Sequence, residues 1–355
     1  MVGISLLTLV PGISGGSETY ARELCRALAR VGTLEYRVFV PGIATDAGDG
    51  LASQTVDGYR ASRTMPGRIA AMSRATLNPE PLRRALELDH LNAIHFPLSV
   101  MLPAVDRPPA ATTVLDLQHA EHPEFFGRAE RAYREVVYGR TIRRSRIVIT
   151  ISEHAKETLI ERYALDPARV RSIHLAVDHS VFAPEPIASG GDYLLYPARP
   201  WKHKNHARLY EAFALLRREH PELRLVLTGD GDFGTVPPAV DVRGRVATSE
   251  LVALYRGAAA LVFPSLYEGF GIPLVEAMAC GCPVACSNVT SLPEVAGGAA
   301  RLFDPQSSAD IVAAVNDVLG DRTTWIERGL ERARHFTWDA CALAHEEVYR
   351  ELPSG

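Results

Sequence analysis

The sequence predicts an α/β protein with two domains, each built on a parallel sheet with helices on both faces. Short β-rich runs alternate with amphipathic helical stretches, and after Asp178 the same alternation starts again. Strands that alternate with helices in this way form parallel sheets covered by helices. The length of 355 residues fits two domains, on a prior of about 100–200 residues per domain.

The first predicted domain spans residues 1–181. Its predicted strands are Ile4–Val10, Tyr36–Val40, Ala93–Phe96, Thr112–Leu115 and Ile147–Ile151. The predicted helices between them include Glu18–Arg30, Pro79–Leu86 and Arg128–Arg144. The apolar start of the chain is cut short by Pro11-Gly12, which indicates a buried strand and not a signal peptide. No later stretch stays apolar for the ~18 residues that a spanning helix needs, so we expect a cytoplasmic protein.

The second predicted domain spans residues 190–336, after a linker at Phe182–Gly191 that is rich in Pro, Gly and small residues. Its predicted strands are Tyr193–Pro197, Leu223–Thr228, Ala239–Arg243, Ala260–Phe263, Pro283–Cys286 and Ala299–Phe303. A last helix is predicted at Thr337–Leu352, and its own residues leave open which domain it packs on.

Charge and cysteine content exclude several classes. The formal net charge of −4 argues against a nucleic-acid binder, which needs a basic excess to neutralise phosphates. Five cysteines, an odd number, suit reduced packing thiols better than a disulfide framework. Cys280, Cys282 and Cys286 lack the Cys-x-x-Cys spacing of a zinc site, and we expect no metal there.

The densest pattern is the run Phe263–Gly281, in which Glu268 and Glu276 flank a glycine-containing loop and Pro273 marks the first turn of a helix. Backbone N–H groups at a helix start, with the partial positive charge there, make a site for a diphosphate. Carboxylates accept paired hydrogen bonds from vicinal hydroxyls, so one Glu suits a ribose and the other a sugar. Either Glu alone could instead be a solvated or dipole-compensating residue.

A basic loop, Arg199-Pro-Trp-Lys202-His-Lys204-Asn205, follows the strand that ends at Pro197. Its side chains are expected at the carboxyl edge of the second sheet, where such folds bind ligands. Arg offers a bidentate fork for phosphate and Lys a compact charge. The alternative is a basic loop that caps the next helix.

Two first-domain loops carry further candidates. Gly12, Gly15 and Gly16 stand between a strand and a helix start, where missing side chains allow a ligand to approach the backbone. The G-x-G-x-x-G spacing of a dinucleotide site is absent, which argues against NAD. Asp116 and His119 follow another strand, and a neutral imidazole donates to a sugar oxygen or a departing phosphate. A His119-x-x-His122 metal pair is the alternative.

Two other charged patterns receive no catalytic role. Asp230-Gly-Asp232 is interpreted as a turn near the nucleotide base, because Asp is favoured in such turns for conformational reasons. The run Arg140, Arg143, Arg144 and Arg146 is typical of a solvated helix end, and a contact with an anionic acceptor or a membrane surface is its alternative.

These motifs together resemble a retaining glycosyltransferase of family 4, and the resemblance covers nearly the whole chain. Its motifs are Gly15-Gly16, Asp116-Leu-Gln-His119 with His122-Pro123, Ile149-Thr-Ile-Ser152-Glu153, Val177-Asp178, Arg199 with Lys204-Asn205, Glu268-x7-Glu276, and Phe336-Thr-Trp338. The resemblance implies the GT-B fold: two Rossmann-like domains that face each other across a cleft, with residues 337–355 crossing back to the first domain.

The family pattern also implies roles for single residues. Glu276 would bind the ribose, Glu268 would lie against the donor sugar, and Arg199 and Lys204 would stabilise the diphosphate, with Lys202 as the fallback. His119 would sit near the sugar. The other expected donor contacts are Gly15, Gly16, Asp116, Gly229, Arg243, Phe270, Gly271, Ile272, Leu274 and Val275.

The expected activity is transfer of a hexose, mannose from GDP-mannose or another sugar from a UDP-hexose, to a carbohydrate-containing acceptor. The resemblance implies retention of configuration, a front-face reaction, and no cofactor or metal. We expect a monomer or weak dimer with no nucleic-acid partner. The alternatives are a sugar-nucleotide epimerase or hydrolase of the same fold, and a non-catalytic nucleotide-sugar-binding protein. Acceptor choice would fall to loops such as Asp46–Arg74, which carry no readable signature.

Overall fold

The computed structural model describes residues 1–13, 15–185 and 191–354, which form two compact units. Unit 1 comprises Met1–Leu175 and Trp338–Gly355, and unit 2 comprises Ala176–Thr337. The units join in sequence at Leu175 and Ala176, before the predicted linker Phe182–Gly191, of which residues 186–190 lie outside the described residues. Each unit contains one parallel sheet, which confirms the predicted α/β class with two sheets.

Unit 1 is built on a seven-stranded sheet in the order β3-β2-β1-β4-β5-β6-β7, and every pair in it is parallel. The strands are β1 Val2–Ser5, β2 Tyr36–Val40, β3 Ser53–Thr55, β4 Ala93–Phe96, β5 Ala110–Val114, β6 Ile147–Thr150 and β7 Val170–Ser172. All residues of β1, β4, β5 and β6 are buried. Their nearly continuous apolar sequences fit strands that are covered on both faces.

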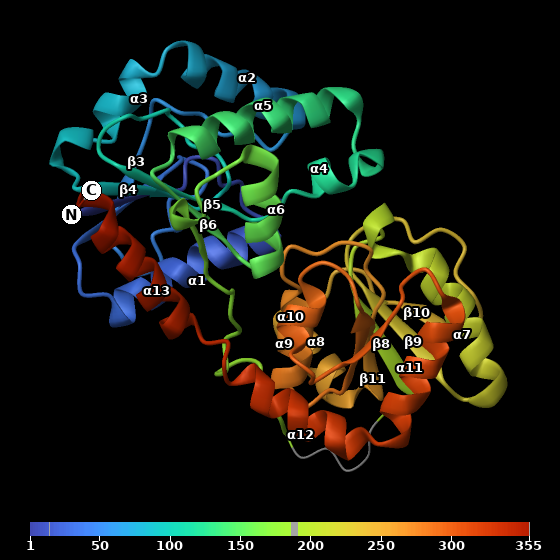
Figure 1. Cartoon of the computed structure of the whole chain (residues 1–355). Helices are drawn as coiled ribbons and strands as arrows, with labels where there is room; N and C mark the ends of the chain where they lie inside the picture. Colours follow the sequence, from blue (N-terminus) through green and yellow to red (C-terminus); the bar gives the residue numbers. More distant parts are fainter. Residues whose placement is uncertain (14, 186–190, 355) are drawn as a thin grey trace. The chain divides into compact units, whose positions relative to one another are not determined.

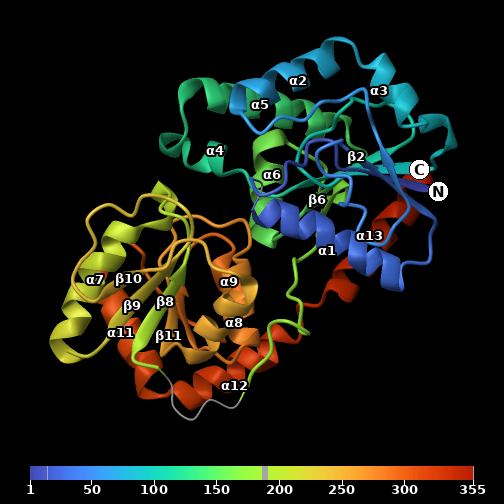
Figure 2. The same ribbon diagram turned by 180° about the vertical axis from the view of Figure 1, so that it is seen from behind.

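The helices of unit 1 lie on both faces of this sheet, with α1 and α13 on one side and α2 and α5 on the other (Figures 1 and 2). They are α1 Gly16–Val31, α2 Met65–Leu77, α3 Glu80–Ala85, α4 Gln118–Glu121, α5 Arg128–Arg144, α6 Glu153–Tyr163 and α13 Trp338–Glu351. The last helix, red in Figure 1, lies alongside α1 although the whole chain separates them in sequence. The end of the chain therefore completes unit 1, as the resemblance implied.

A buried chain of hydrogen bonds fastens α13 to this sheet. Tyr349 lies 2.8 Å from His95 Nδ1, and His95 Nε2 lies 2.8 Å from Thr113 Oγ1. Thr113 contacts the Tyr20 hydroxyl at 2.8 Å, and Tyr20 contacts His345 Nε2 at 2.8 Å. His345 Nδ1 faces a carbonyl one turn earlier, so Nδ1 carries the proton and Nε2 accepts from Tyr20. Every group is then satisfied with both histidines neutral, and burial indeed lowers the pKa of His345 to about 4 and lowers that of His95.

Unit 2 is built on a six-stranded parallel sheet in the order β10-β9-β8-β11-β12-β13. Its strands are β8 Tyr193–Pro197, β9 Arg224–Thr228, β10 Val240–Val242, β11 Ala260–Phe263, β12 Val284–Ser287 and β13 Arg301–Phe303. Its helices are α7 His206–Glu219, α8 Thr248–Gly257, α9 Ile272–Ala279, α10 Leu292–Ala296, α11 Ser308–Gly320 and α12 Arg322–Ala333. The chain builds outward from β8 to β10, then returns to the other side of β8 with β11 (Figure 2).

Three expectations about single elements were wrong or incomplete. The predicted strand Ile4–Val10 ends at Ser5, because the following apolar residues form a turn in which Leu9 N–H donates to Leu6 O over 2.9 Å. Those residues are still mostly buried, so the prediction from the apolar run was right about their burial and wrong about their strand structure. The edge strands β3 and β7 were not predicted, since each has three residues and no alternating pattern to detect.

Candidate functional site

The candidate residues of unit 2 gather at the point of the parallel sheet where the strand order reverses. The strands β8, which ends at Pro197, and β11, which ends at Phe263, are neighbours, and the chain adds β9 and β10 on one side of this pair and β12 and β13 on the other. In open α/β sheets, ligands bind beyond the carboxyl ends of the strands at such a switch point. The basic loop after β8 and the Glu268 loop after β11 therefore start at one edge of the sheet, as predicted.

The two loops are hydrogen-bonded to each other. Leu266 N–H donates to His203 O over 2.7 Å, and the Asn205 amide donates to Pro264 O over 3.1 Å. The buried Tyr196 hydroxyl donates to Lys204 O over 2.8 Å. Asn205 itself has a left-handed backbone, with φ of 59°. Tyr196 was not predicted as a site residue, because its contact depends on how the strands are placed.

Lys204 and Glu268 form a largely buried ion pair. Lys204 Nζ lies 2.5 Å from Glu268 Oε1, and the two side chains are only 13% and 12% exposed. The ammonium also lies 5.4 Å from the centre of the Phe263 ring. Lys202, by contrast, is exposed. The geometry therefore favours Lys204 over Lys202 as the lysine that shares a site with Glu268.

Arg199 lies against the glycine turn that follows β9. Its guanidinium is 3.8 Å from Asp230 Oδ2 and 5.5 Å from the centre of the Trp201 ring. Gly229, with φ of 122°, comes so close that an added Cβ would lie 2.9 Å from Arg199 N. Arg243 is exposed and its Nε lies 2.6 Å from Asp241 Oδ2. The structure thus brings Arg199 and Gly229 together and ties Arg243 to its own strand end.

The loop before α10 is hydrogen-bonded to the segment that leads into α9. Glu268 N–H donates to Thr290 Oγ1 over 3.1 Å, and Ser291 Oγ contacts Glu268 O at 2.9 Å and Phe270 O at 3.1 Å. No side chain caps the helix at Gly271, and Leu274 N–H turns back to Gly271 O over 3.0 Å. Of the predicted donor contacts here, the side chains of Phe270, Leu274 and Val275 are buried and that of Ile272 is partly exposed, so backbone groups are what this turn offers a ligand. Sequence reasoning missed Thr290 and Ser291.

Gly271 carries a backbone requirement that can be tested. Its φ is 100°, and an added Cβ would lie 2.7 Å from Leu292 Cδ2. Gly271→Ala is expected to lower the free energy of unfolding of unit 2 by about 1–2 kcal/mol, since an L-residue is strained in this region. Urea denaturation checks this, with Gly320→Ala as the control, because Gly320 has open space and no positive φ. Equal stability of the two variants would contradict the strain argument.

Glu276 faces a tyrosine on a neighbouring helix. The buried Tyr255 hydroxyl of α8 donates to Glu276 Oε2 over 2.8 Å, while Glu276 keeps part of its surface exposed. Burial raises the pKa of Glu276 to about 7, although the hydrogen bond from Tyr255 acts in the opposite direction. Tyr255 was not predicted, because nothing in its helical sequence signals a contact 21 residues away.

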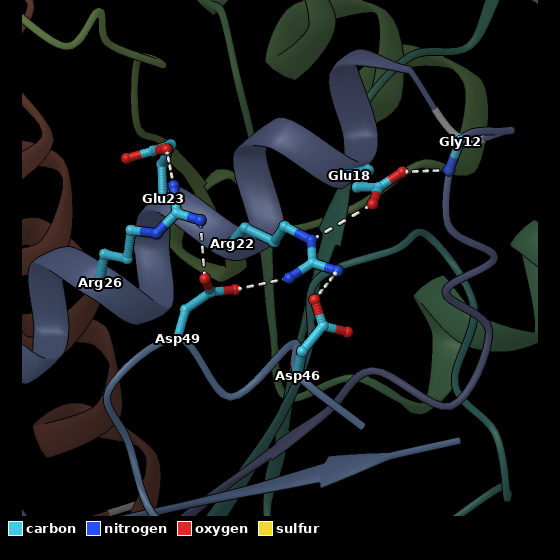
Figure 3. A network of polar contacts seen from close by, with 7 residues as sticks. All are labelled: Gly12, Glu18, Arg22, Glu23, Arg26, Asp46 and Asp49. Carbon is cyan, nitrogen blue, oxygen red and sulfur yellow. Dashed lines mark hydrogen bonds and ion pairs between the residues drawn. The ribbon is translucent and has the colours of Figure 1, made fainter. Parts of the chain in front are cut away.

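In unit 1, the glycine loop before α1 is tied down by a polar network (Figure 3). Gly12 N–H donates to Glu18 Oε2 over 2.8 Å, and Arg22 Nε donates to Glu18 Oε1 over 3.2 Å. Arg22 also pairs with Asp46 at 3.0 Å and with Asp49 at 3.2 Å. Gly15 caps α1 with φ of 52° and no side-chain hydrogen bond, and Gly16 begins the helix. Of the described loop residues, Gly12 is therefore held through its backbone N–H, and Gly15 and Gly16 present no side chain.

Asp116 and His119 differ in how accessible they are. Asp116 is partly exposed and accepts the Gln118 N–H over 3.1 Å. His119 has no exposed surface: its ring packs edge-on against Tyr138 with centroids 5.1 Å apart, and burial lowers its pKa. The expected contact between His119 and a sugar does not match this arrangement, because the α4–α5 connection covers the ring. Neither ring nitrogen has a hydrogen-bond partner among the described residues.

In the described part of the chain, no group of three or more His, Cys, Asp or Glu side chains is placed to hold a metal ion. All five cysteines are free and buried. None of the helices within residues 1–13, 15–185 and 191–354 has the length and apolar character to cross a membrane.

Comparison with known proteins gives consistent matches. The family described as "Glycosyltransferase Family 4" matches residues 14–181, and "Glycosyl transferases group 1" matches residues 179–334. The chain is 31% identical over 270 residues to O-antigen chain mannosyltransferase B of Escherichia coli. This alignment covers 68% of this chain and 70% of the relative. Among solved structures, sucrose-phosphate synthase from Thermosynechococcus elongatus aligns with a TM-score of 0.78 at 21% identity, over 99% of this chain and 98% of that one. HepE of Anabaena in complex with UDP-glucose aligns with a TM-score of 0.70 at 15% identity, over 99% of each chain. These two structures share the fold.

Proposed function

This chain belongs to glycosyltransferase family 4 and is a glycosyltransferase with the GT-B fold, and we propose that it transfers a hexose, mannose from GDP-mannose in the first instance. The relative from Escherichia coli that supports this choice is a mannosyltransferase by name. A UDP-hexose is the second candidate donor, because the structurally similar HepE is described in complex with UDP-glucose. The proposed acceptor is a carbohydrate or glycoconjugate.

The observation that carries the proposal is the Lys204–Glu268 pair next to the start of α9. A diphosphate needs cations and backbone donors, and a sugar needs a carboxylate, and unit 2 supplies these groups on two hydrogen-bonded loops. In the proposed complex, Lys204, Arg199 and the first N–H groups of α9 contact the diphosphate. Glu268 accepts from sugar hydroxyls and Glu276 from the ribose hydroxyls.

The remaining donor contacts are assigned more briefly. Gly229 follows β9 and lies against Arg199, and Arg243 follows β10. Both are proposed to contact the nucleoside. Gly15, Gly16 and Asp116 are proposed to contribute from unit 1. Because the His119 ring is buried, its proposed part is to support the loop that carries Asp116.

We propose a front-face reaction with retention of configuration. The acceptor oxygen bonds to C1 of the sugar as the bond from C1 to the diphosphate oxygen breaks, and the acceptor proton passes to that leaving oxygen. Charge grows on the diphosphate as the bond breaks, so donors that are already in place there stabilise the transition state. On this proposal Lys204 and Arg199 supply the positive charge, and no metal or other cofactor is needed.

A donor panel tests the proposal. GDP-mannose is expected to raise the melting temperature, because a ligand at about 100 times its Kd adds ~2.7 kcal/mol to the folded state. UDP-glucose, GDP-glucose and UDP complete the panel, and transfer is measured with EDTA present and with mannose-containing oligosaccharides as acceptors. The anomeric configuration of the product is read by NMR.

Each alternative predicts a different result in the same panel. A hydrolase or epimerase would consume the donor when no acceptor is present, and a binding protein would give a thermal shift without product for any acceptor. If no nucleotide sugar changes the melting temperature, the donor site proposed here is wrong.

A further inference from the structure

We propose that Tyr255 is a positioning residue for nucleotide binding: its hydroxyl holds Glu276 as an ionised carboxylate, turned so that it accepts the ribose hydroxyls. The inference rests on the proposed function, in which Glu276 binds the ribose. Tyr255 does not touch the ligand itself and acts through Glu276.

The geometry fixes one of the two carboxylate oxygens. Tyr255 lies on α8, is fully buried, and donates to Glu276 Oε2 over 2.8 Å. A buried tyrosine hydroxyl needs a partner, and a hydrogen bond to an ionised acceptor is about twice as strong as a neutral one. With Oε2 held in this way the carboxylate cannot rotate freely, and Oε1 is left to accept from the ligand.

The protonation state of Glu276 decides whether it can do this. A carboxylate only accepts hydrogen bonds, whereas a carboxylic acid carries a proton on one oxygen and loses acceptor capacity towards a diol. Burial raises the pKa of Glu276 to about 7, so both forms are populated near neutral pH, and the Tyr255 hydrogen bond favours the ionised one. Binding of the nucleotide should therefore release a proton below pH 7 and become tighter as the pH rises.

Burial raises the pKa values of the thiols and of the tyrosine near Glu276 well above that of Glu276. Tyr255 of α8 and Cys280 beyond the end of α9 interact with this carboxylate. Arg256 of α8 and Cys282 lie next to Cys280, and Arg322 of α12 lies next to Cys282. Burial raises the pKa of Cys280 and of Cys282 to about 12, and raises that of Tyr255 well above its usual value. Arg256 is paired with Glu185 at 2.7 Å. Of Tyr255, Cys280, Cys282 and Glu276, Glu276 is therefore the group whose pKa lies near neutral pH.

Tyr255→Phe tests the proposal through the pH dependence of binding. The Kd of GDP-mannose, and separately of UDP-glucose, is measured by calorimetry from about pH 5.5 to 9. A nucleotide sugar is used because a terminal phosphate, as in GDP, has its own ionisation near pH ~6. For the wild type, Kd should fall up to about tenfold per pH unit below 7 and then level off. In Tyr255→Phe the midpoint should move to higher pH, giving a Kd roughly tenfold weaker at pH 6 and within about twofold of the wild type at pH 9.

Tyr193→Phe is the matched control. This variant also loses one tyrosine hydrogen bond in the same unit, because the Tyr193 hydroxyl donates to Leu254 O over 2.8 Å, but that bond involves no carboxylate. The Kd of Tyr193→Phe should depend on pH as that of the wild type does. Glu276→Gln should bind more weakly at all pH values and lose the pH dependence below 7.

The outcomes separate this inference from the proposed function. If Tyr255→Phe and Tyr193→Phe give the same profile, or if Tyr255→Phe is weaker by the same factor at every pH, Tyr255 has no such role. If the wild type binds neither nucleotide sugar at any pH, the proposed function itself is wrong.

Discussion

Replacing Lys204 by alanine is expected to lower kcat by about 10²–10³-fold, because removal of one preorganised charge-stabilising donor typically costs this much. The affinity for the nucleoside part should change far less, since Lys204 is proposed to act on the diphosphate. The variant also leaves Glu268 without its ion-pair partner at a site where both side chains are at most 13% exposed. Turnover with saturating acceptor measures the effect on kcat, and the inhibition constant of guanosine, which lacks the diphosphate, measures the affinity for the nucleoside part.

Lys202→Ala is the control, since Lys202 lies two residues away in the same loop and is exposed. Its turnover should stay within about twofold of the wild type. A double change, Lys204→Ala with Glu268→Gln, removes the unpaired charge and shows whether a loss of folding explains the result. Wild-type turnover in a folded Lys204→Ala variant would remove Lys204 from the mechanism.

Glu346→Ala is expected to destabilise unit 1 by about 1–3 kcal/mol, the cost of leaving the buried Tyr36 hydroxyl without its acceptor. Glu346 of α13 is 3% exposed and accepts from Thr33 N at 2.7 Å, from Thr33 Oγ1 at 2.5 Å, and from Tyr36 and Arg350. The bonds from Thr33 and Tyr36 join the last helix to the segment between α1 and β2 and to the start of β2. Hydrogen exchange of the α13 amides measures the loss directly, and Glu347→Ala, at an exposed site on the same helix, should leave that exchange unchanged. Slow exchange in Glu346→Ala would contradict the anchoring role.

The same helix makes unit 1 sensitive to acid. Burial alone would raise the pKa of Glu346, but hydrogen bonds from Thr33 and Tyr36 and the bond from Arg350 bring it down to about 2, from an ordinary 4.5. The stabilisation from Glu346 is therefore complete above pH 4.5 and is lost as the pH falls through 2. For His345, burial lowers the pKa from 6.5 to about 4, so its contribution is complete above pH 6.5 and is lost as the pH falls to 4. Urea midpoints should therefore decrease steadily below pH 6.5.

The places of the unit 2 candidate residues in the fold could be predicted from sequence because the segments that carry them are local. Strand, loop and helix start follow one another within Phe263–Gly281, and the basic loop directly follows β8, so the spacing placed Glu268 and Arg199 in loops at the carboxyl ends of neighbouring strands. What holds these residues in place comes from distant segments and has no local pattern. Tyr255 approaches Glu276 from another helix, and Thr290 and Ser291 reach the Glu268 loop from beyond β12.

Unit 1 was harder to predict, for two physical reasons. Its buried network joins Tyr20, His95 and Thr113 to a helix more than 200 residues later, and no periodicity in either segment signals that contact. His119 follows a strand, where a catalytic side chain is expected, but Phe126 of the α4–α5 connection and Tyr138 of α5 pack edge-on against its ring. Position along the chain indicates which edge of a sheet a residue lies at, and packing decides whether its side chain is accessible.

The binding of the donor's diphosphate to Lys204 and to the start of α9 is tested most directly by a crystal structure with GDP bound. Phosphate oxygens should lie about 3 Å from Lys204 Nζ and from backbone N–H groups in the first turn of α9, with the ribose hydroxyls on Glu276. Density for GDP elsewhere in the molecule, with Lys204 still paired only with Glu268, would contradict the account.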